Sequence, residues 1–409
     1  MNATTTNVSI DLWSSASFAN GHPVHQYHWL QENAPVYWHD EPGGAGFWAV
    51  TTAGLVKEAS VRPQIFSNRF GMTMYDVSET ELSAIQHMMM FMDPPRHTQY
   101  RKLVSSEFTP RSAARWASLI DRLADEIIDQ VCEAGECELM SQVAGLLPSY
   151  LVAELLGVPR RDGIRLYELT EVMHSAQDAV SDEQRAAARE EMLQFGTDLR
   201  ARKVRQPDES LASRLVHAEV DGHRLDDLDF NLFILLLVNA GGDTVRNLVG
   251  GAMLTLFEHP DAKSRLIADI AGLMPRAVEE FLRYQSPVVF MRRTALQDTR
   301  LGAVNIAAGE KVLLYFGAAN RDPAVFADPD DFIVDRHPNP HMGFGAGGPH
   351  FCLGAHFARL EISAMMSRLL TRLPNLELVG EPTWLASNFI SGPTEVNLRF
   401  TPSLKGVRY

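Results

Sequence analysis

Hydrophobic residues recur every three or four positions along most of this chain, which is the spacing of an amphipathic helix. Ile120 and Leu123 belong to one such stretch, and Asp226 begins another, where acidic residues suit the positive end of a helix dipole. Gly157 follows a third stretch, and Pro275 opens a fourth. The pattern predicts helices at 111–133, 147–156, 226–258 and 275–284.

Strand signals are few. Short β-branched and aromatic runs predict strands at 46–52, 310–316 and 394–401. Between Asn320 and Gly348 the chain is rich in Pro, Asp, Asn and Gly, which predicts a long loop of the kind that is often functional. We therefore expect a mainly α protein with a long central helix and a small β-rich region, and we expect residues 1–409 to form a single domain.

Composition narrows the function classes. The net charge is −14, from 37 Lys and Arg against 51 Asp and Glu, which argues against nucleic acid or an anionic membrane as main partner. Three cysteines form no disulfide framework and favour a reducing compartment. Two of them, Cys132 and Cys137, lie in a polar stretch without a second ligand pair, so we expect ordinary thiols.

The N-terminal segment gives no targeting signal. Residues 1–15 contain no basic segment followed by an apolar one, so we expect no secretory signal. The most apolar run, 230–238, is far shorter than the ~20 residues that cross a bilayer. We expect a cytoplasmic protein without a membrane span.

A glycine-rich loop precedes Cys352, and a helical stretch follows it. A cysteine before a helix is close to the positive end of the helix dipole, which favours the thiolate that binds iron. Glycines allow the backbone to pass close to a flat macrocycle and to point N–H groups at the sulfur. A buried structural cysteine is the alternative. A phosphate-binding loop is a third reading, but the Gly-Lys-Ser/Thr ending is missing.

This loop resembles the haem-binding loop of cytochromes P450, Phe-Gly-x-Gly-x-His/Arg-x-Cys-x-Gly. The matching residues are Phe344, Gly345, Gly347, His350, Cys352 and Gly354. One extra residue lies between Gly347 and His350, as in some bacterial branches that act on methyl-branched lipids and sterols. The resemblance implies the P450 fold, haem b as cofactor, Cys352 as the axial iron ligand, and Phe344 and Gly345 beside the cofactor.

Glu280 and Arg283 match the Glu-x-x-Arg motif of the same family. Residues i and i+3 share a helix face, so the two side chains can pair. The motif alone is weak, because such pairs are usually surface contacts. The resemblance implies a structural set that also includes Arg336 and fixes the loop of Cys352.

Two adjacent glycines lie in the middle of the long helix, in the sequence Asn239-Ala-Gly-Gly-Asp243-Thr244. Each costs roughly 1 kcal/mol relative to Ala in a helix. Either an oxygen-binding groove or close helix–helix packing would explain them. The resemblance implies that Asp243 and Thr244 deliver protons, and that Ala240 and Gly241 adjoin the haem.

Further basic residues match positions that bind the haem propionates in the family. His97 and Arg101 are i and i+4 and therefore face one way. The resemblance implies that they bind one propionate, that Arg293 binds the other, and that His350 assists.

The substrate is inferred from the resemblance alone. The expected pocket draws on 70–90 and on Leu236, Asn239, Val288, Val289, Phe290, Phe389 and Ile390. These mainly apolar residues suit a hydrophobic small molecule. A lipid, terpenoid or steroid-like substrate is favoured, and an aromatic or secondary-metabolite scaffold is the alternative.

The resemblance implies a monooxygenase that uses O2. Because no flavin or dinucleotide-binding module is evident, we expect a ferredoxin with its reductase to supply electrons. The candidate basic contacts for the ferredoxin are Arg96, Arg101, Lys102 and Arg359. We expect a monomer. A haem-thiolate peroxygenase and a non-catalytic haem sensor are the competing functions. The Asp243–Thr244 pair argues against the peroxygenase, and the complete set of pocket motifs argues against the sensor.

Overall fold

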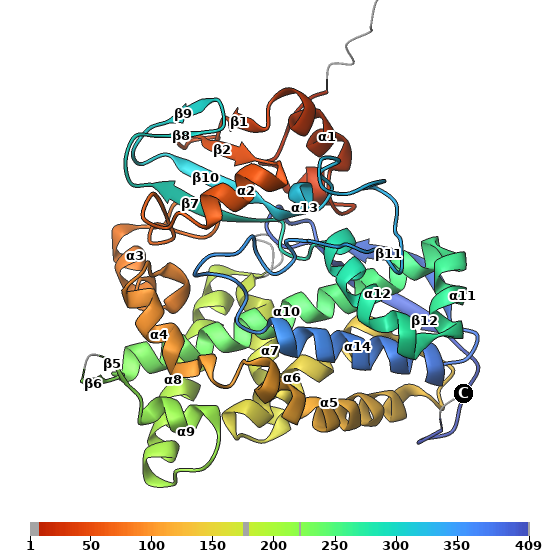
Figure 1. Cartoon of the computed structure of the whole chain (residues 1–409). Coiled ribbons are helices and arrows are strands. Elements are labelled where there is room, and N and C mark those ends of the chain that lie inside the picture. The colour runs from red at the N-terminus through yellow and green to blue at the C-terminus, as the bar shows by residue number, and fades with distance from the viewer. Residues whose placement is uncertain (1–7, 175–179, 221, 408–409) are drawn as a thin grey trace, which may run out of the picture.

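The structure is a computed structural model that describes residues 8–174, 180–220 and 222–407 (Figure 1). The first seven α-helices are α1 Val24–Asn33, α2 Ala53–Ser60, α3 Glu79–Ile85, α4 Arg96–Ser105, α5 Pro110–Val131, α6 Leu146–Leu156 and α7 Arg160–His174. The others are α8 Asp182–Arg205, α9 Leu211–Val216, α10 Asp227–Glu258, α11 Pro260–Ala268, α12 Ile270–Gln285, α13 Phe316–Ala319 and α14 Ala355–Arg372. Short 3-10 turns at Ser15–Phe18 and Met89–Phe91 and a π-turn at Met140–Ala144 complete the helical part.

The main sheet has five strands in the order β1-β2-β10-β7-β3, with β2 and β10 parallel and the other neighbours antiparallel. A second sheet has the order β11-β12-β4, and β5-β6 and β8-β9 are hairpins. The first six strands are β1 Val36–His39, β2 Phe47–Val50, β3 Phe66–Ser67, β4 Glu136–Glu138, β5 Glu219–Val220 and β6 His223–Arg224. The other six are β7 Phe290–Ala295, β8 Thr299–Leu301, β9 Val304–Ile306, β10 Lys311–Tyr315, β11 Glu377–Trp384 and β12 Pro393–Arg399.

Helices and sheet occupy different parts of the molecule. In Figure 1 the five-stranded sheet lies at the top with α1, α2 and α13, and the long helices lie below it. The largest hydrophobic cluster is formed by these long helices, and two smaller clusters lie around the sheet. The expected mainly α architecture with a small β region is confirmed.

The central helix is α10, which begins at the predicted position because the Asp226 side chain accepts a hydrogen bond from the Asp229 backbone N–H at 2.8 Å. By length and hydropathy α10 could span a membrane. However, 61% of its most apolar window is buried inside the protein, which identifies it as a core helix.

The other predicted helices differ at one boundary. α5 and α6 match their predictions, and Gly157 ends α6 in the left-handed conformation. The prediction that the fourth helix starts at Pro275 is wrong, because α12 starts five residues earlier at Ile270. The Asp269 carboxylate accepts a hydrogen bond from Gly272 N–H at 2.9 Å and caps this earlier turn, so Pro275 lies inside the helix.

Strands β2, β10 and β12 occur where the sequence predicts strands, and residues 320–348 form the predicted loop of turns and bends. The sequence pattern missed α8. Its buried face has only two large hydrophobic residues, Met192 and Leu199. The other buried residues of this helix are Ala188, Gly196 and the charged Lys203. Such a face gives little hydrophobic contrast with the polar face.

The paired glycines of α10 have different surroundings. A Cβ at Gly242 would lie 2.9 Å from the Tyr167 ring of α7, whereas a Cβ at Gly241 would lie 3.6 Å from Val152 of α6. Close helix packing therefore explains Gly242, and the groove reading is wrong for this position. Gly241 has room for a methyl group.

We predict that Gly242→Ala lowers the free energy of unfolding by about 1–3 kcal/mol, because the methyl group overlaps Tyr167. Gly241→Ala is the matched control, and we expect it to be neutral or to stabilise by up to about 1 kcal/mol through helix propensity. Denaturant unfolding of both variants measures the difference. Equal effects would contradict the assignment of close packing to Gly242 alone.

Candidate functional site

The centre of the site scaffold is the Glu280 carboxylate, which is fully buried on α12. Arg283, also fully buried, binds it through two hydrogen bonds of 2.8 Å. Arg336 donates from Nε to both carboxylate oxygens at 3.0 and 3.1 Å. Ile333 N–H and the Asn339 amide donate two further hydrogen bonds, which satisfy this buried charge.

The two arginines also hold the long loop. Arg283 donates to the backbone carbonyls of Asn320 and Pro329, and both guanidiniums donate to the carbonyl of Asp331. The Asn320 side chain accepts a hydrogen bond from the Met342 N–H at 2.6 Å. The loop from α13 to α14 is therefore fixed by side chains instead of by regular backbone hydrogen bonding.

Cys352 lies at the end of this loop. Its N–H donates to the Phe344 carbonyl at 2.9 Å, which closes the glycine-rich turn. The consecutive residues Gly347 and Gly348 both have positive φ, and a Cβ on Gly348 would lie 2.5 Å from the Ser60 carbonyl of α2. The extra length of the loop thus contacts α2 and leaves the turn at Cys352 closed.

Opposing effects act on the pKa of the Cys352 thiol. Burial raises the pKa of the thiol above its usual value, although the Gly354 N–H and the positive charges of Arg101 and Arg359 act in the opposite direction. α14 begins only at Ala355, so Cys352 lies outside its first turn. Desolvation therefore opposes the thiolate form, and a thiolate at Cys352 stays a prediction.

Four basic side chains gather on one side of this loop. The ring centroids of buried His97 and half-buried His350 lie 4.2 Å apart, and the Arg101 guanidinium donates to the Phe351 carbonyl at 2.7 Å. Arg293 is 4% exposed, and burial lowers its pKa to about 10. Burial, together with the nearby positive charges, lowers the pKa of His97 to about 4 and of His350 to about 2.

None of these basic residues forms an ion pair with a carboxylate within the described ranges, although the charge of Asp93 acts on His97 and Arg293. His97 Nδ1 and His350 Nε2 are buried without a hydrogen-bond partner among the residues that the structure describes. The hydrogen bond recorded for the Arg293 guanidinium goes to the carbonyl of Arg292. Such a cluster is costly unless a negatively charged ligand is bound there. It therefore fits the carboxylates of a bound cofactor.

The middle of α10 is open on one face. Ala240 is exposed, and Gly241, Asp243 and Thr244 are half-buried, although most of the helix on either side is buried. The Thr244 hydroxyl donates to the Ala240 carbonyl at 3.2 Å. The opening lies at the small residues of the predicted motif and leaves space for a ligand.

The expected pocket residues divide into two groups. Val289 and Phe290 are fully buried in the core around Tyr315, so their assignment to the pocket wall is not supported. Leu236 is also buried, on α10. The remaining expected residues are partly exposed, namely Asn239, Val288, Phe389 and Ile390. Val288 pairs with Ile390, which brings two distant segments together.

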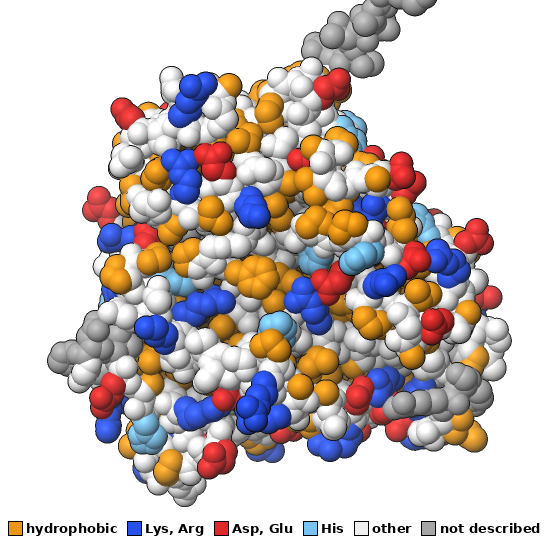
Figure 2. Space-filling view, viewed as in Figure 1, with side chains coloured by type: hydrophobic (Ala, Val, Ile, Leu, Met, Phe, Trp, Pro, Cys, Tyr) orange, Lys and Arg blue, Asp and Glu red, His pale blue; other side chains and the backbone are white. Residues whose placement is uncertain are grey.

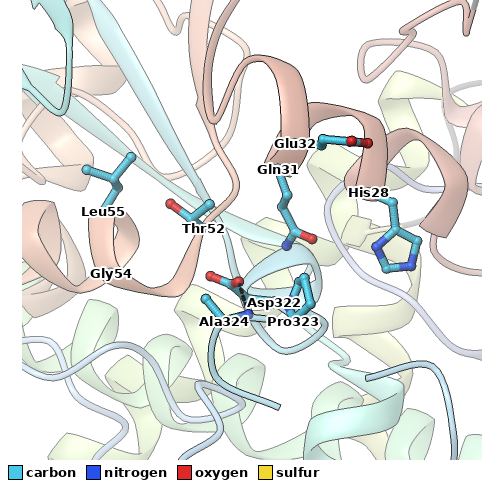
Figure 3. Close-up of a pocket in the computed structure, with 9 residues that line it drawn as sticks. All are labelled: His28, Gln31, Glu32, Thr52, Gly54, Leu55, Asp322, Pro323 and Ala324. Carbon is cyan, nitrogen blue, oxygen red and sulfur yellow. Dashed lines mark hydrogen bonds between the residues drawn. The ribbon is translucent and has the colours of Figure 1, made fainter. Parts of the chain in front are cut away.

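A separate cleft of about 630 Å³ lies between α1, α2 and the segment after α13 (Figure 3). None of the predicted site residues lines it. Asp322 lines it and accepts hydrogen bonds from Ala53 N–H at 2.8 Å and from Ala324 N–H at 2.9 Å, the second of which Figure 3 shows. Asp322 therefore has a structural role at the start of α2.

The basic residues suggested for partner docking are not equivalent. Arg359 binds both oxygens of Glu279, and Arg101 donates to a backbone carbonyl of the cysteine loop. These contacts fix the two arginines, so they are poor docking residues. Lys102 is exposed on α4 and has no ion-pair partner in the described part of the chain. Figure 2 shows Lys and Arg side chains among hydrophobic ones on this face.

Sequence reasoning missed Glu361 on α14. It is 4% exposed, and its Oε2 has no hydrogen-bond partner within residues 8–174, 180–220 and 222–407. Burial raises its pKa to about 8. The signal in the sequence was a lone acidic residue on a helix after the cysteine loop, which is ordinarily a surface position.

Comparison with known proteins identifies the family. The cytochrome P450 family model matches residues 138–377. The chain is 38% identical over 380 residues to the methyl-branched lipid omega-hydroxylase of Mycobacterium tuberculosis, covering 89% of this chain and 87% of that protein. It is 36% identical over 407 residues to the steroid C26-monooxygenase of Mycolicibacterium smegmatis, covering 97% and 98%.

The fold agrees with the family that the sequence comparisons identify. A Mycobacterium marinum cytochrome P450 solved in complex with pseudoionone superposes with a TM-score of 0.89 at 34% identity, covering 97% of this chain and 100% of that one. This chain belongs to the cytochrome P450 family. The P450 is a monooxygenase with haem b as cofactor, and it acts on hydrophobic small molecules with O2 and redox partners.

The residues of this P450 fit haem b. Arg101 and Arg293 would supply positive charge for two propionates, and the unpartnered ring nitrogens of His97 and His350 would supply hydrogen-bonding groups. Cys352 supplies a sulfur at the end of a rigid loop. The support for this fit is the two histidine nitrogens without a hydrogen-bond partner among the described residues and the closed turn at Cys352.

Because burial raises the pKa of Glu361 from 4.5 to about 8, the folded P450 binds this proton more tightly than the unfolded chain does. The stabilising effect is complete below about pH 4.5 and is lost as pH rises towards about 8, by up to about 1.4 kcal/mol per pH unit. We predict that Glu361→Gln removes this part of the pH dependence. Denaturant unfolding between about pH 5 and about pH 9 measures it, with exposed Glu381→Gln as control. Parallel pH profiles for Glu361→Gln and the parent would contradict the prediction.

Proposed function

We propose that Cys352 is the axial haem ligand and that His97, Arg101, Arg293 and His350 bind the propionates. The support is the closed turn at Cys352 and the cluster of basic groups beside it. Glu280, Arg283 and Arg336 maintain the position of the loop. Phe344 and Gly345 form the turn next to the cofactor, and Ala240 and Gly241 line the opposite side.

Haem with a thiolate ligand activates O2 with two electrons and allows one oxygen atom to be inserted into the substrate. This chemistry requires protons at a defined position. Asp243 is half-buried on the open face of α10 and acts as the proton donor. Because the Thr244 hydroxyl donates to the Ala240 carbonyl, its oxygen is available to accept a hydrogen bond from a protonated group. Thr244 thereby holds the proton-bearing group in place.

The substrate is a lipid or a steroid-like molecule. Two relatives that cover most of the chain are named for methyl-branched lipids and for steroids. Val288, Phe389 and Ile390 provide apolar surface, and the Asn239 Oδ1 is a buried acceptor without a partner among the described residues. An elongated apolar substrate with one hydroxyl group would satisfy both features.

Electrons come from a ferredoxin that is reduced by its own reductase. Exposed Lys102 on α4 lies next in sequence to Arg101, which contacts the cysteine loop, so an acidic ferredoxin that contacts Lys102 would be close to Cys352. The enzyme acts in the cytoplasm as a monomer, and residues 1–409 form one domain. No nucleic acid or membrane is required.

We predict that methyl-branched fatty acids and steroids shift the haem Soret band at lower concentrations than aromatic or secondary-metabolite scaffolds do. Titration of a compound library measures this. Cys352→Ala should lose the thiolate–haem spectrum, including the carbon monoxide difference band, while Cys132→Ala retains it. An unchanged carbon monoxide band in Cys352→Ala would reject the ligand assignment, and preferential binding of aromatic scaffolds would reject the substrate class.

Thr244→Ala should uncouple electron use from product formation. We expect product formed per reductant consumed to fall by about an order of magnitude, because water only partly replaces the hydroxyl. Thr244→Ser retains the hydroxyl and should remain coupled. Full coupling in Thr244→Ala, measured with O2 and the redox partners, would show that protons arrive by another route. Turnover with peroxide but none with O2 would favour the peroxygenase alternative.

Lys102→Glu should raise the apparent KM for ferredoxin by about fivefold, because one interfacial ion pair contributes roughly 1 kcal/mol. The effect should shrink as salt is added. Lys405→Glu is the control, since this exposed lysine pairs with Glu133 near the C-terminus, on the opposite side of Figure 1 from α4. Equal KM changes in both variants would argue against docking at α4.

A further inference from the structure

A cluster of charged residues joins α7 to the part of α10 that carries Asp243. Arg246 on α10 donates from Nη1 to the Glu171 Oε1 of α7 at 2.5 Å. The centre of its guanidinium lies 5.8 Å from the ring centroid of Tyr167. The Arg246 side chain is only 15% exposed, whereas that of Glu171 is 40% exposed. Arg246 is therefore held between two side chains of α7.

Asp243 is electrostatically part of this cluster. Asp243 and Arg246 are i and i+3 on α10 and share a face. Burial raises the pKa of Glu171, the charge of Asp243 raises it further, and Arg246 opposes both. Two carboxylates thus share the positive charge of one half-buried guanidinium.

The guanidinium has a donor to spare. The Arg246 Nε is buried and makes no hydrogen bond to any residue in the described ranges. The helices are also close together here, because Gly242 leaves no Cβ between α10 and the ring of Tyr167. Arg246 can consequently strengthen its pairing with Asp243 if Glu171 releases it, without any large movement of α7.

We propose that Glu171 is a positioning residue for proton delivery, which rests on the proposed role of Asp243. Glu171 binds the Arg246 guanidinium and so limits ion pairing between Arg246 and Asp243. A carboxylate that is fully paired with a buried arginine holds a proton weakly. By holding Arg246, Glu171 keeps Asp243 able to take up and release the protons that the reaction consumes.

The test compares four variants as haem-loaded enzymes with the redox partners. Glu171→Gln should lower coupled turnover by roughly tenfold, because the released Arg246 guanidinium pairs with Asp243 and slows proton transfer. Glu168→Gln is the matched control, because Glu168 is on the same helix, pairs with Arg165 and is exposed. The double variant Glu171→Gln/Arg246→Gln should recover towards the parent, since no guanidinium remains to pair with Asp243.

Infrared difference spectroscopy provides a readout that is independent of turnover. The Asp243 carboxylate band is assigned by its loss in Asp243→Asn, and it should shift in Glu171→Gln because Asp243 pairs more strongly with the Arg246 guanidinium. A purely structural role for the ion pair would leave this band unchanged and would make the double variant as impaired as the single one or worse, and either result overturns the proposal. If Asp243→Asn itself remains fully coupled, the proposed role of Asp243 fails first, and this outcome is distinct from failure of the Glu171 variants alone.

Discussion

The structure depends on one buried carboxylate and the two arginines that surround it. Moving a charge from water into the protein interior costs roughly several kcal/mol of free energy, unless hydrogen-bond partners in the protein replace the lost water. At Glu280 they do, because Arg283, Arg336, Ile333 and Asn339 all donate to it. The same guanidiniums bind backbone carbonyls of a loop without regular secondary structure. The buried ion pairs of Glu280 with Arg283 and Arg336 thus fix the segment that presents Cys352.

Charge in the site is arranged for a ligand. Around the cysteine loop the protein gathers Arg101 and Arg293 with His97 and His350, and one ring nitrogen of each histidine has no hydrogen-bond partner among the described residues. In the middle of α10, Ala240 is exposed, and Gly241, Asp243 and Thr244 are half-buried. Both features reduce the stability of the protein alone and are offset when an anionic, flat cofactor is bound. The charges beside the cysteine loop and the open face of α10 therefore both fit haem.

The sequence predicted most of this site because its motifs are local. The cysteine loop, the Glu-x-x-Arg pair and the α10 motif each have spacings that a reader can match one by one. Errors arose where a residue's partner comes from a distant segment. Gly242 contacts Tyr167, Arg359 pairs with Glu279, and Val289 is buried in the sheet core. No local pattern contains these partners.

By itself the sequence determined the mainly helical fold, its long central helix, the loop before α14 and the identity of the chemically important side chains, since periodicity and short motifs are written in neighbouring residues. Only the tertiary structure decided which of those side chains share charge, and how far burial opposes ionisation. The Cys352 thiol and the Glu361 carboxyl owe their raised pKa values to desolvation by residues remote in the chain. Desolvation is set by the packing of the whole molecule, which no stretch of sequence specifies.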